Sequence, residues 1–158
     1  MEAFSAGLGQ GSEFVIRIPA IAESPMLTDE TLQSGMQHGT RRVLVVDDNV
    51  DAAECIGVML ELKGHHVEIA YDGFAAVELA KRDKPDIILL DIGLPGRDGY
   101  EVAKILRSDS DLVHTKIIAV TGYGQDEDRR RSKQAGMDEH LTKPVNPDTL
   151  AHLLQRLA

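Results

Sequence analysis

The chain has 158 residues, enough for one domain of ordinary size and a short additional segment. Apolar residues make up 42% of it, so a normal core can form, but only 4% are aromatic and aliphatic packing must supply most of that core. The formal net charge of −9 argues against nucleic-acid binding, because neutralising phosphate groups requires clustered Lys and Arg.

Cysteine usage and hydropathy bear on where the protein acts. Cys55 is the single cysteine, so no internal disulfide can form, which fits a reducing cytoplasm. Its position in an amphipathic helix pattern predicts a packing role. No apolar run approaches the roughly 20 residues of a membrane helix, and no signal sequence begins the chain. We therefore expect a soluble, cytoplasmic protein without direct membrane insertion.

The first 40 residues differ in character from the rest. Glycines at positions 7, 9 and 11 indicate a turn, and the β-branched run over residues 14–18 predicts one strand. One strand cannot form a sheet, so we expect residues 1–19 to be disordered or to add to a neighbour's sheet edge, which would give a homodimer. Residues 20–40 are polar without apolar periodicity, as in a linker.

From residue 41 onward, short apolar runs alternate with helical patterns. The sequence predicts strands at residues 43–46, 67–70, 87–90, 116–120 and around Leu141, and helices at 51–63, from Gly73, through 102–106, at 125–136 and from Pro147. Strict alternation implies parallel strands and right-handed crossovers. We therefore predict an α/β fold with a doubly wound, five-stranded parallel sheet and helices on both faces, in which ligands bind beyond the carboxyl ends of the strands.

Polar side chains follow four of the predicted strands at that edge: Asp47 and Asp48, Asp91, Thr121, and Lys143. Each of them alone would be an ordinary cap, turn or surface residue, and only their joint occurrence is specific. Three neighbouring carboxylates repel one another and would raise one another's pKa, whereas a hard cation such as Mg²⁺ makes the arrangement favourable. An amine and a hydroxyl beside such a cation suit phosphoryl oxygens.

Residues 41–158 resemble a response-regulator receiver domain over their whole length. The matching motifs are the acidic pair Asp47-Asp48, Asp91, the loop Leu94-Pro95-Gly96-Arg97-Asp98-Gly99, Thr121, and Lys143 followed by Pro144, which the family often holds in cis. The resemblance implies a flavodoxin-like (βα)5 fold with the strand order 2-1-3-4-5. It also implies Mg²⁺ as the cofactor.

Each site residue has a counterpart in the family. The resemblance implies that Asp91 is the phosphoacceptor and a metal ligand, with Asp48 binding the metal directly and Asp47 mainly through water. The backbone carbonyl of Gly93 matches the remaining protein ligand. Lys143 and Thr121 match the lysine and the switch hydroxyl that contact the phosphoryl group.

The family's chemistry supplies the expected partners. The donor would be the phosphohistidine domain of a histidine kinase, and a histidine phosphotransfer protein could receive the phosphoryl group afterwards. The domain itself would catalyse its aspartyl phosphorylation and a slow dephosphorylation. The new dianion would draw Thr121 inward and change the conformation of a nearby loop and helix face.

Two positions deserve separate expectations. The family usually has Tyr or Phe three residues before its lysine, where this chain has His140, and two readings stay open: a rotating switch residue or a surface histidine. Tyr123 lies two residues after Thr121, where it either screens the phosphoryl group from water or is an exposed loop tyrosine.

Residues 5–19 look like the last glycine box and final strand of a histidine-kinase ATPase domain. Residues 1–19 would then be a remnant of that domain, 20–40 a linker and 41–158 the receiver. The fragment would lack a kinase domain and represent the C-terminal receiver of a hybrid sensor histidine kinase, whose parent protein could be membrane-anchored.

Three other classes of protein compete with this interpretation. A pseudo-receiver, acting only as an interaction module, would have lost the acidic pair, the acceptor or the lysine, and all are present. A phosphatase of the haloacid-dehalogenase type would need a carboxylic acid two residues after its nucleophile, where this chain has Gly93. A flavin binder would need phosphate-cradling turns instead of an acidic site.

Overall fold

The computed structural model describes residues 2–5, 12–15, 39–122 and 126–157. The chain divides into two compact units, Met1–Gln37 and His38–Ala158. None of the described helices is long and apolar enough to cross a bilayer. Of the predicted linker over residues 20–40, all but residues 39 and 40 lie outside the described residues, as does the predicted loop residue Tyr123.

The first unit contains an antiparallel pair of strands, β1 (Glu2–Ser5) and β2 (Ser12–Val15), with Phe14 opposite Ala3. The expectation that the strand near Phe14 has no partner within the chain is therefore wrong. β1 has no β-branched residue, so its composition did not indicate a strand, and the pairing itself stabilises it.

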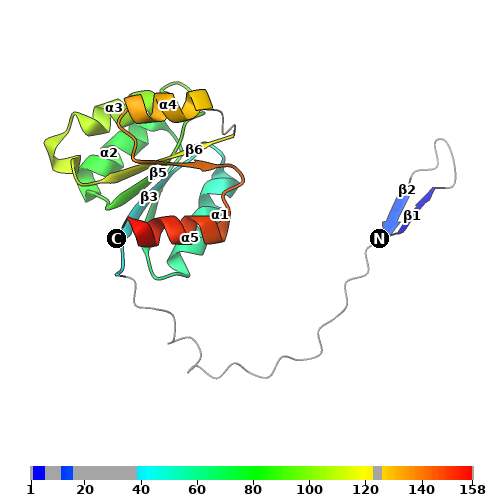
Figure 1. Cartoon of the computed structure of the whole chain (residues 1–158). Helices are drawn as coiled ribbons and strands as arrows, with labels where there is room; N and C mark the ends of the chain where they lie inside the picture. Colours follow the sequence, from blue (N-terminus) through cyan, green and yellow to red (C-terminus); the bar gives the residue numbers. More distant parts are fainter. Residues whose placement is uncertain (1, 6–11, 16–38, 123–125, 158) are drawn as a thin grey trace, which may run out of the picture. The chain divides into compact units, whose positions relative to one another are not determined.

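The second unit is built on a parallel sheet of five strands in the order β4-β3-β5-β6-β7 (Figure 1). These strands are β3 (Arg42–Val46), β4 (His66–Ala70), β5 (Ile87–Asp91), β6 (Lys116–Thr121) and β7 (Glu139–Thr142). Numbered within this unit, their order is 2-1-3-4-5. The predicted flavodoxin-like topology is confirmed.

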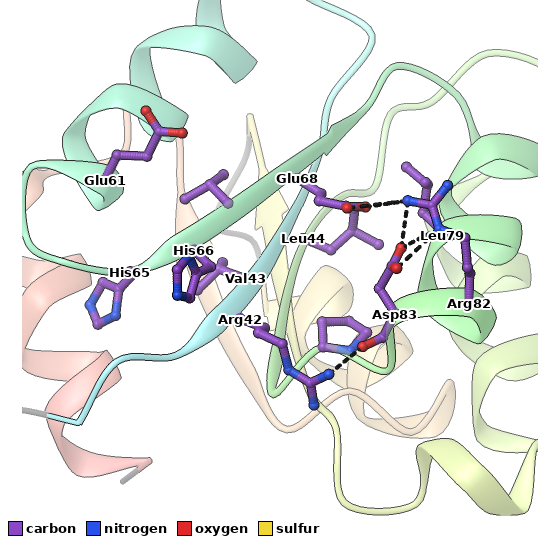
Figure 2. A pocket seen from close by; sticks show the side chains of 12 residues that line it. Arg42, Val43, Leu44, Glu61, His65, His66, Glu68, Leu79, Arg82 and Asp83 are labelled. Carbon is purple, nitrogen blue, oxygen red and sulfur yellow. Dashed lines mark hydrogen bonds and ion pairs between the residues drawn. The ribbon is translucent and has the colours of Figure 1, made fainter.

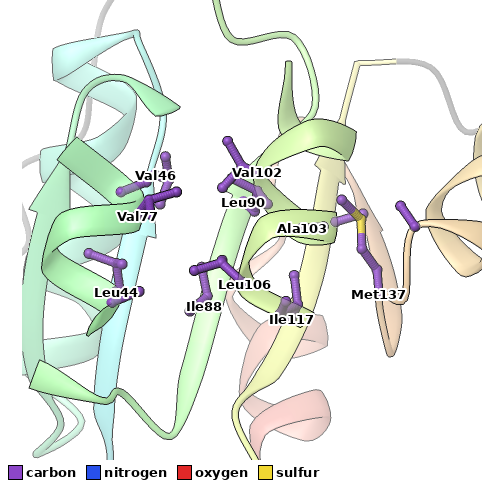
Figure 3. Packing of buried hydrophobic residues seen from close by; sticks show 14 of the residues in the cluster. Leu44, Val46, Val77, Ile88, Leu90, Val102, Ala103, Leu106, Ile117 and Met137 are labelled. Carbon is purple, nitrogen blue, oxygen red and sulfur yellow. The ribbon is translucent and has the colours of Figure 1, made fainter. Parts of the chain in front are cut away.

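Helices cover both faces of the sheet. They are α1 (Val50–Glu61), α2 (Gly73–Asp83), α3 (Gly99–Arg107), α4 (Asp126–Gln134) and α5 (Pro147–Arg156), with a short 3-10 helix η2 (Ser110–Leu112) before β6. Buried residues of α2 and α3 pack on Leu44, Ile88 and Ile117, and Met137 after α4 joins this cluster (Figure 3). Buried residues of α1 and α5 pack on the opposite face, around Val43 and Val45. Neighbouring residues of one strand thus enter different cores, which explains the unbroken apolar runs.

Side-chain caps start the helices that follow the strands. Asn49 accepts from the amide of Ala52 at α1, Asp98 from that of Glu101 at α3, and Asn146 caps α5 directly before Pro147. The caps place the N-termini of these helices just beyond the carboxyl edge of the sheet, where the polar residues gather.

Cys55 is exposed on α1, so the expected packing role is wrong. Ile56 and Leu60 take the inward positions of that helix. Helical spacing alone left the phase of the face uncertain by one residue, and this is enough to turn a side chain from the core to solvent.

Candidate functional site

Three carboxylates meet at the carboxyl edge of the sheet. Asp47 and Asp48 directly follow β3, Asp91 is the last residue of the adjacent β5, and one oxygen of each lies within 4.8 Å of the others. Asp47 and Asp91 are only 2% and 6% exposed, whereas Asp48 is exposed. The cluster is thus buried on one side and open to solvent on the other.

Lys143 lies between the two buried carboxylates. Its Nζ is 2.7 Å from Oδ2 of Asp47 and 2.8 Å from Oδ2 of Asp91, and a cis peptide bond joins it to Pro144. Burial acts to lower the pKa of Lys143, but hydrogen bonds to Asp47 and Asp91 and their charges outweigh it, so the pKa is raised. The ammonium group therefore stays charged and faces the carboxylate of Asp91.

Backbone amides fix the other oxygens of these carboxylates. The amide of Asn49 donates to Oδ1 of Asp47, and the amide of Gly93 donates to Oδ1 of Asp91, each at 3.0 Å. Each carboxylate is thus held by an amide two residues further on and by Lys143, which sets its orientation. Sequence reasoning did not assign a role to Asn49, although its place between the acidic pair and an apolar-periodic helix is typical of a helix cap.

The donor set suits a hard divalent cation. The three carboxylates and the one ammonium group leave two negative charges at the cluster, and all the candidate ligands are oxygens. Mg²⁺ prefers oxygen ligands, retains several waters and binds through one or two carboxylates, which an edge open at Asp48 permits. The residues present therefore fit Mg²⁺.

Thr121 and His140 lie beside each other on β6 and β7. The Oγ1 of Thr121 and the Nε2 of His140 share a hydrogen bond of 3.2 Å, while the buried Nδ1 of His140 has no hydrogen-bond partner within the described part of the chain. His140 is half-buried, and its contact with Thr121 places it where a switch residue would lie. Burial, and then the charge of Arg129, lower the pKa of His140, whereas Asp128 acts to raise it. The net decrease in the pKa favours the neutral ring.

This environment predicts how stability depends on pH. The pKa of His140 is lower in the folded than in the unfolded chain. As the pH falls through the ordinary histidine pKa of 6.5, the unfolded chain therefore binds more protons than the folded chain, and the free energy of unfolding decreases. His140→Phe should lose this decrease between about pH 7.5 and about pH 5.5 in urea unfolding. His152→Phe, at an exposed position of α5, should retain it, and an unchanged pH dependence in His140→Phe would contradict the prediction.

A hollow at the opposite edge of the sheet contains further charged side chains (Figure 2). Arg82 pairs there with Glu68 and Asp83, and Arg42 donates to the carbonyl of Asp83. Asp83 and then Glu68 raise the pKa of the Arg82 guanidinium. These charges pair with one another near the amino end of β3, the middle of β4 and the end of α2, away from the three clustered carboxylates.

The family model of the response regulator receiver domain matches residues 43–155. Because this is well over half of the chain, the chain belongs to the response-regulator receiver domain family. Aspartyl phosphorylation and Mg²⁺ binding are general features of these two-component signalling domains.

Individual relatives agree with this assignment. The protein PilH of Pseudomonas aeruginosa is 38% identical over 109 residues, covering 69% of this chain and 90% of PilH. The polar-differentiation response regulator DivK of Brucella ovis is 35% identical over 107 residues, covering 68% of this chain and 87% of DivK.

Solved structures share the fold. The chemotaxis protein CheY4 of Vibrio cholerae has a TM-score of 0.73 at 32% identity, covering 76% of this chain and 100% of CheY4. The receiver domain of a sensor histidine kinase of Pseudomonas aeruginosa has a TM-score of 0.70 at 35% identity, covering 75% of this chain and 98% of that domain. That domain has a magnesium ion coordinated in its active-site cleft.

Proposed function

We propose that Asp91 accepts a phosphoryl group from a phosphohistidine in a Mg²⁺-dependent reaction. The observation that carries the proposal is the buried Asp91 carboxylate, held by the Gly93 amide and the Lys143 ammonium beside two further carboxylates. Asp48, Asp91 and the Gly93 carbonyl would hold Mg²⁺, with Asp47 acting mainly through water. Bound Mg²⁺ would supply positive charge that offsets the negative charge of the phosphoryl oxygens.

The transfer is an in-line displacement at phosphorus. An oxygen of Asp91 forms the new bond, the bond from phosphorus to the donor imidazole breaks, and the imidazole keeps the electron pair. Nζ of Lys143 already lies 2.8 Å from Oδ2 of Asp91, so the ammonium group can exchange the free carboxylate for a phosphoryl oxygen with little movement. Positioning and charge compensation by this chain therefore supply the catalysis, and hydrolysis returns the free carboxylate.

Thr121 and His140 would respond to the phosphoryl group. If the Thr121 hydroxyl donates to a phosphoryl oxygen, its Oγ1 can only accept from Nε2 of His140 across their 3.2 Å contact, so the pair keeps this hydrogen bond only when Nε2 carries the proton. Movement of Thr121 toward the phosphoryl group would draw its Oγ1 away from Nε2 of His140, and rotation of the ring in response would make His140 the switch residue. Because His140 belongs to β7, its rotation would change the surface at that strand.

The domain would work within a phosphorelay in the cytoplasm. Its donor is the phosphohistidine domain of a histidine kinase, and a histidine phosphotransfer protein or a homodimer partner is a candidate for the next contact. A hybrid-kinase origin of residues 1–19 would account for a strand in this segment, although the observed strand Ser12–Val15 begins earlier than the final ATPase-domain strand expected after residue 14. Sensor histidine kinases of Pseudomonas aeruginosa and Syntrophus aciditrophicus have receiver domains of similar fold.

Acetyl phosphate tests the chemistry without a cognate kinase. The whole chain should gain the mass of one phosphoryl group when it is incubated with acetyl phosphate and Mg²⁺, and it should show no gain when a chelator removes Mg²⁺ before the incubation. Borohydride reduces an acyl phosphate to an alcohol, so the product should carry homoserine at position 91. No gain under conditions that label a control receiver would leave only an interaction module.

A further inference from the structure

The loop between β5 and α3, residues 92–98, packs closely against the start of α2. A Cβ added at Gly73 would lie 3.0 Å from the carbonyl oxygen of Arg97 and 2.8 Å from Cγ2 of Val102. The start of α2 is itself well held, because Asp72 accepts hydrogen bonds from the amides of Phe74 and Ala75 at 2.8 and 2.9 Å. The loop thus packs against a helix start that is held by its side-chain cap.

Phe74 and Arg97 add a side-chain contact to this backbone packing. The central carbon of the Arg97 guanidinium lies 4.1 Å from the centre of the Phe74 ring, within the range of a cation–π interaction. Phe74 is 60% exposed and therefore contributes little to the core. Its ring is available mainly to Arg97.

Gly99, two residues after Arg97, closes the loop on the backbone of Asp91, where the loop begins. A Cβ added at Gly99 would lie only 2.4 Å from the carbonyl oxygen of Asp91, and the Gly99 amide donates to the carbonyl of Ile92 at 3.2 Å. Gly93 follows Ile92 in this closed loop, and its amide orients the Asp91 carboxylate. A movement of the backbone at Arg97 would therefore also change the position of Gly93, four residues earlier in the same loop.

We propose that Phe74 and Arg97 are positioning residues, which hold the loop so that Gly93 presents its carbonyl to Mg²⁺ and its amide to Asp91. This inference rests on the proposed function, since it takes Gly93 as a metal ligand. Neither side chain touches the reacting atoms. They act by fixing the position of the loop backbone, and this position sets the affinity for Mg²⁺.

The test compares the whole wild-type chain with Phe74→Leu, Arg97→Gln and the double variant, using resolved amide signals in NMR spectra. Without Mg²⁺, amide hydrogen exchange over residues 92–99 should be faster in all three variants. In a titration with MgCl₂, each single variant should bind about two- to fivefold more weakly, the fold-change that a cation–π contact implies. The double variant should be no weaker than either single one, because each change breaks the same contact.

Charge alone predicts the opposite sign for Arg97. Removing a cation near an acidic site strengthens Mg²⁺ binding by simple electrostatics, whereas loss of the loop support weakens it. Lys104→Gln makes the same charge change at an exposed position of α3 and should not speed loop exchange. Tighter binding in Arg97→Gln, or wild-type exchange and affinity in Phe74→Leu, would overturn the positioning role. A wild-type chain that binds no Mg²⁺ would overturn the proposed function instead.

Discussion

Asp91→Asn is expected to abolish phosphorylation by acetyl phosphate completely. The amide has almost the same shape as the carboxylate but carries no negative charge, and an amide oxygen is too weak a nucleophile to attack phosphorus. The amide has a single acceptor oxygen, so it can accept from the Gly93 amide or from Lys143 but not from both, and the variant loses one of these contacts together with the nucleophile. Intact mass after incubation with Mg²⁺ and acetyl phosphate measures the result directly.

Asp51→Asn is the matched control for this variant. This substitution makes the same change in charge and shape at an exposed position in the first turn of α1. The Asp51→Asn variant should therefore gain one phosphoryl group, as the wild type does. If Asp91→Asn gained the phosphoryl group as well, another residue would be the nucleophile. Asp47 and Asp48 would then be the first candidates, since they share the cluster.

Lys143→Gln is expected to change phosphorylation and Mg²⁺ affinity in opposite directions. The rate of phosphorylation should fall by about a hundredfold, as for other groups that stabilise developing charge. Affinity for Mg²⁺ should increase, because Lys143 no longer offsets the charge of Asp47 and Asp91 and the cation meets a more negative site. The lower rate would therefore arise although more of the protein carries the metal.

Two measurements separate these effects. The rate of mass gain at saturating Mg²⁺ reports the chemistry, and a titration followed by NMR reports metal affinity. Lys133→Gln, at an exposed position of α4, controls for a general loss of positive charge and should leave both nearly unchanged. A parallel loss of rate and affinity in Lys143→Gln would mean that Lys143 shapes the site rather than acting through its charge.

The sequence alone determined the architecture of residues 41–158. Strands such as Ile87–Asp91 are buried on both faces and appear as unbroken apolar runs, and caps such as Asp72 and Asn146 mark where helices begin. Since alternation forces parallel strands, the carboxyl ends had to meet at one edge, so the meeting of Asp47, Asp48 and Asp91 followed from chain order alone.

Only the tertiary structure decided how those residues interact. Lys143 lies 52 positions from Asp91, and nothing local indicates that its Nζ is shared with Asp47 or that backbone amides hold the remaining oxygens. The same holds for His140, whose half-buried ring meets Thr121 across two strands. Such contacts depend on rotamers and on register between distant segments, which local patterns do not specify.

The pairing of Glu2–Ser5 with Ser12–Val15 and the exposure of Cys55 show the same limit. A strand with few β-forming residues is stabilised by its partner, and a helix position near the edge of an apolar stripe is decided by what packs against it. Periodicity and chain order therefore determined the fold and the edge at which the site lies. Packing decided which atoms in that site are in contact, because it depends on many contacts between residues that are far apart in the chain.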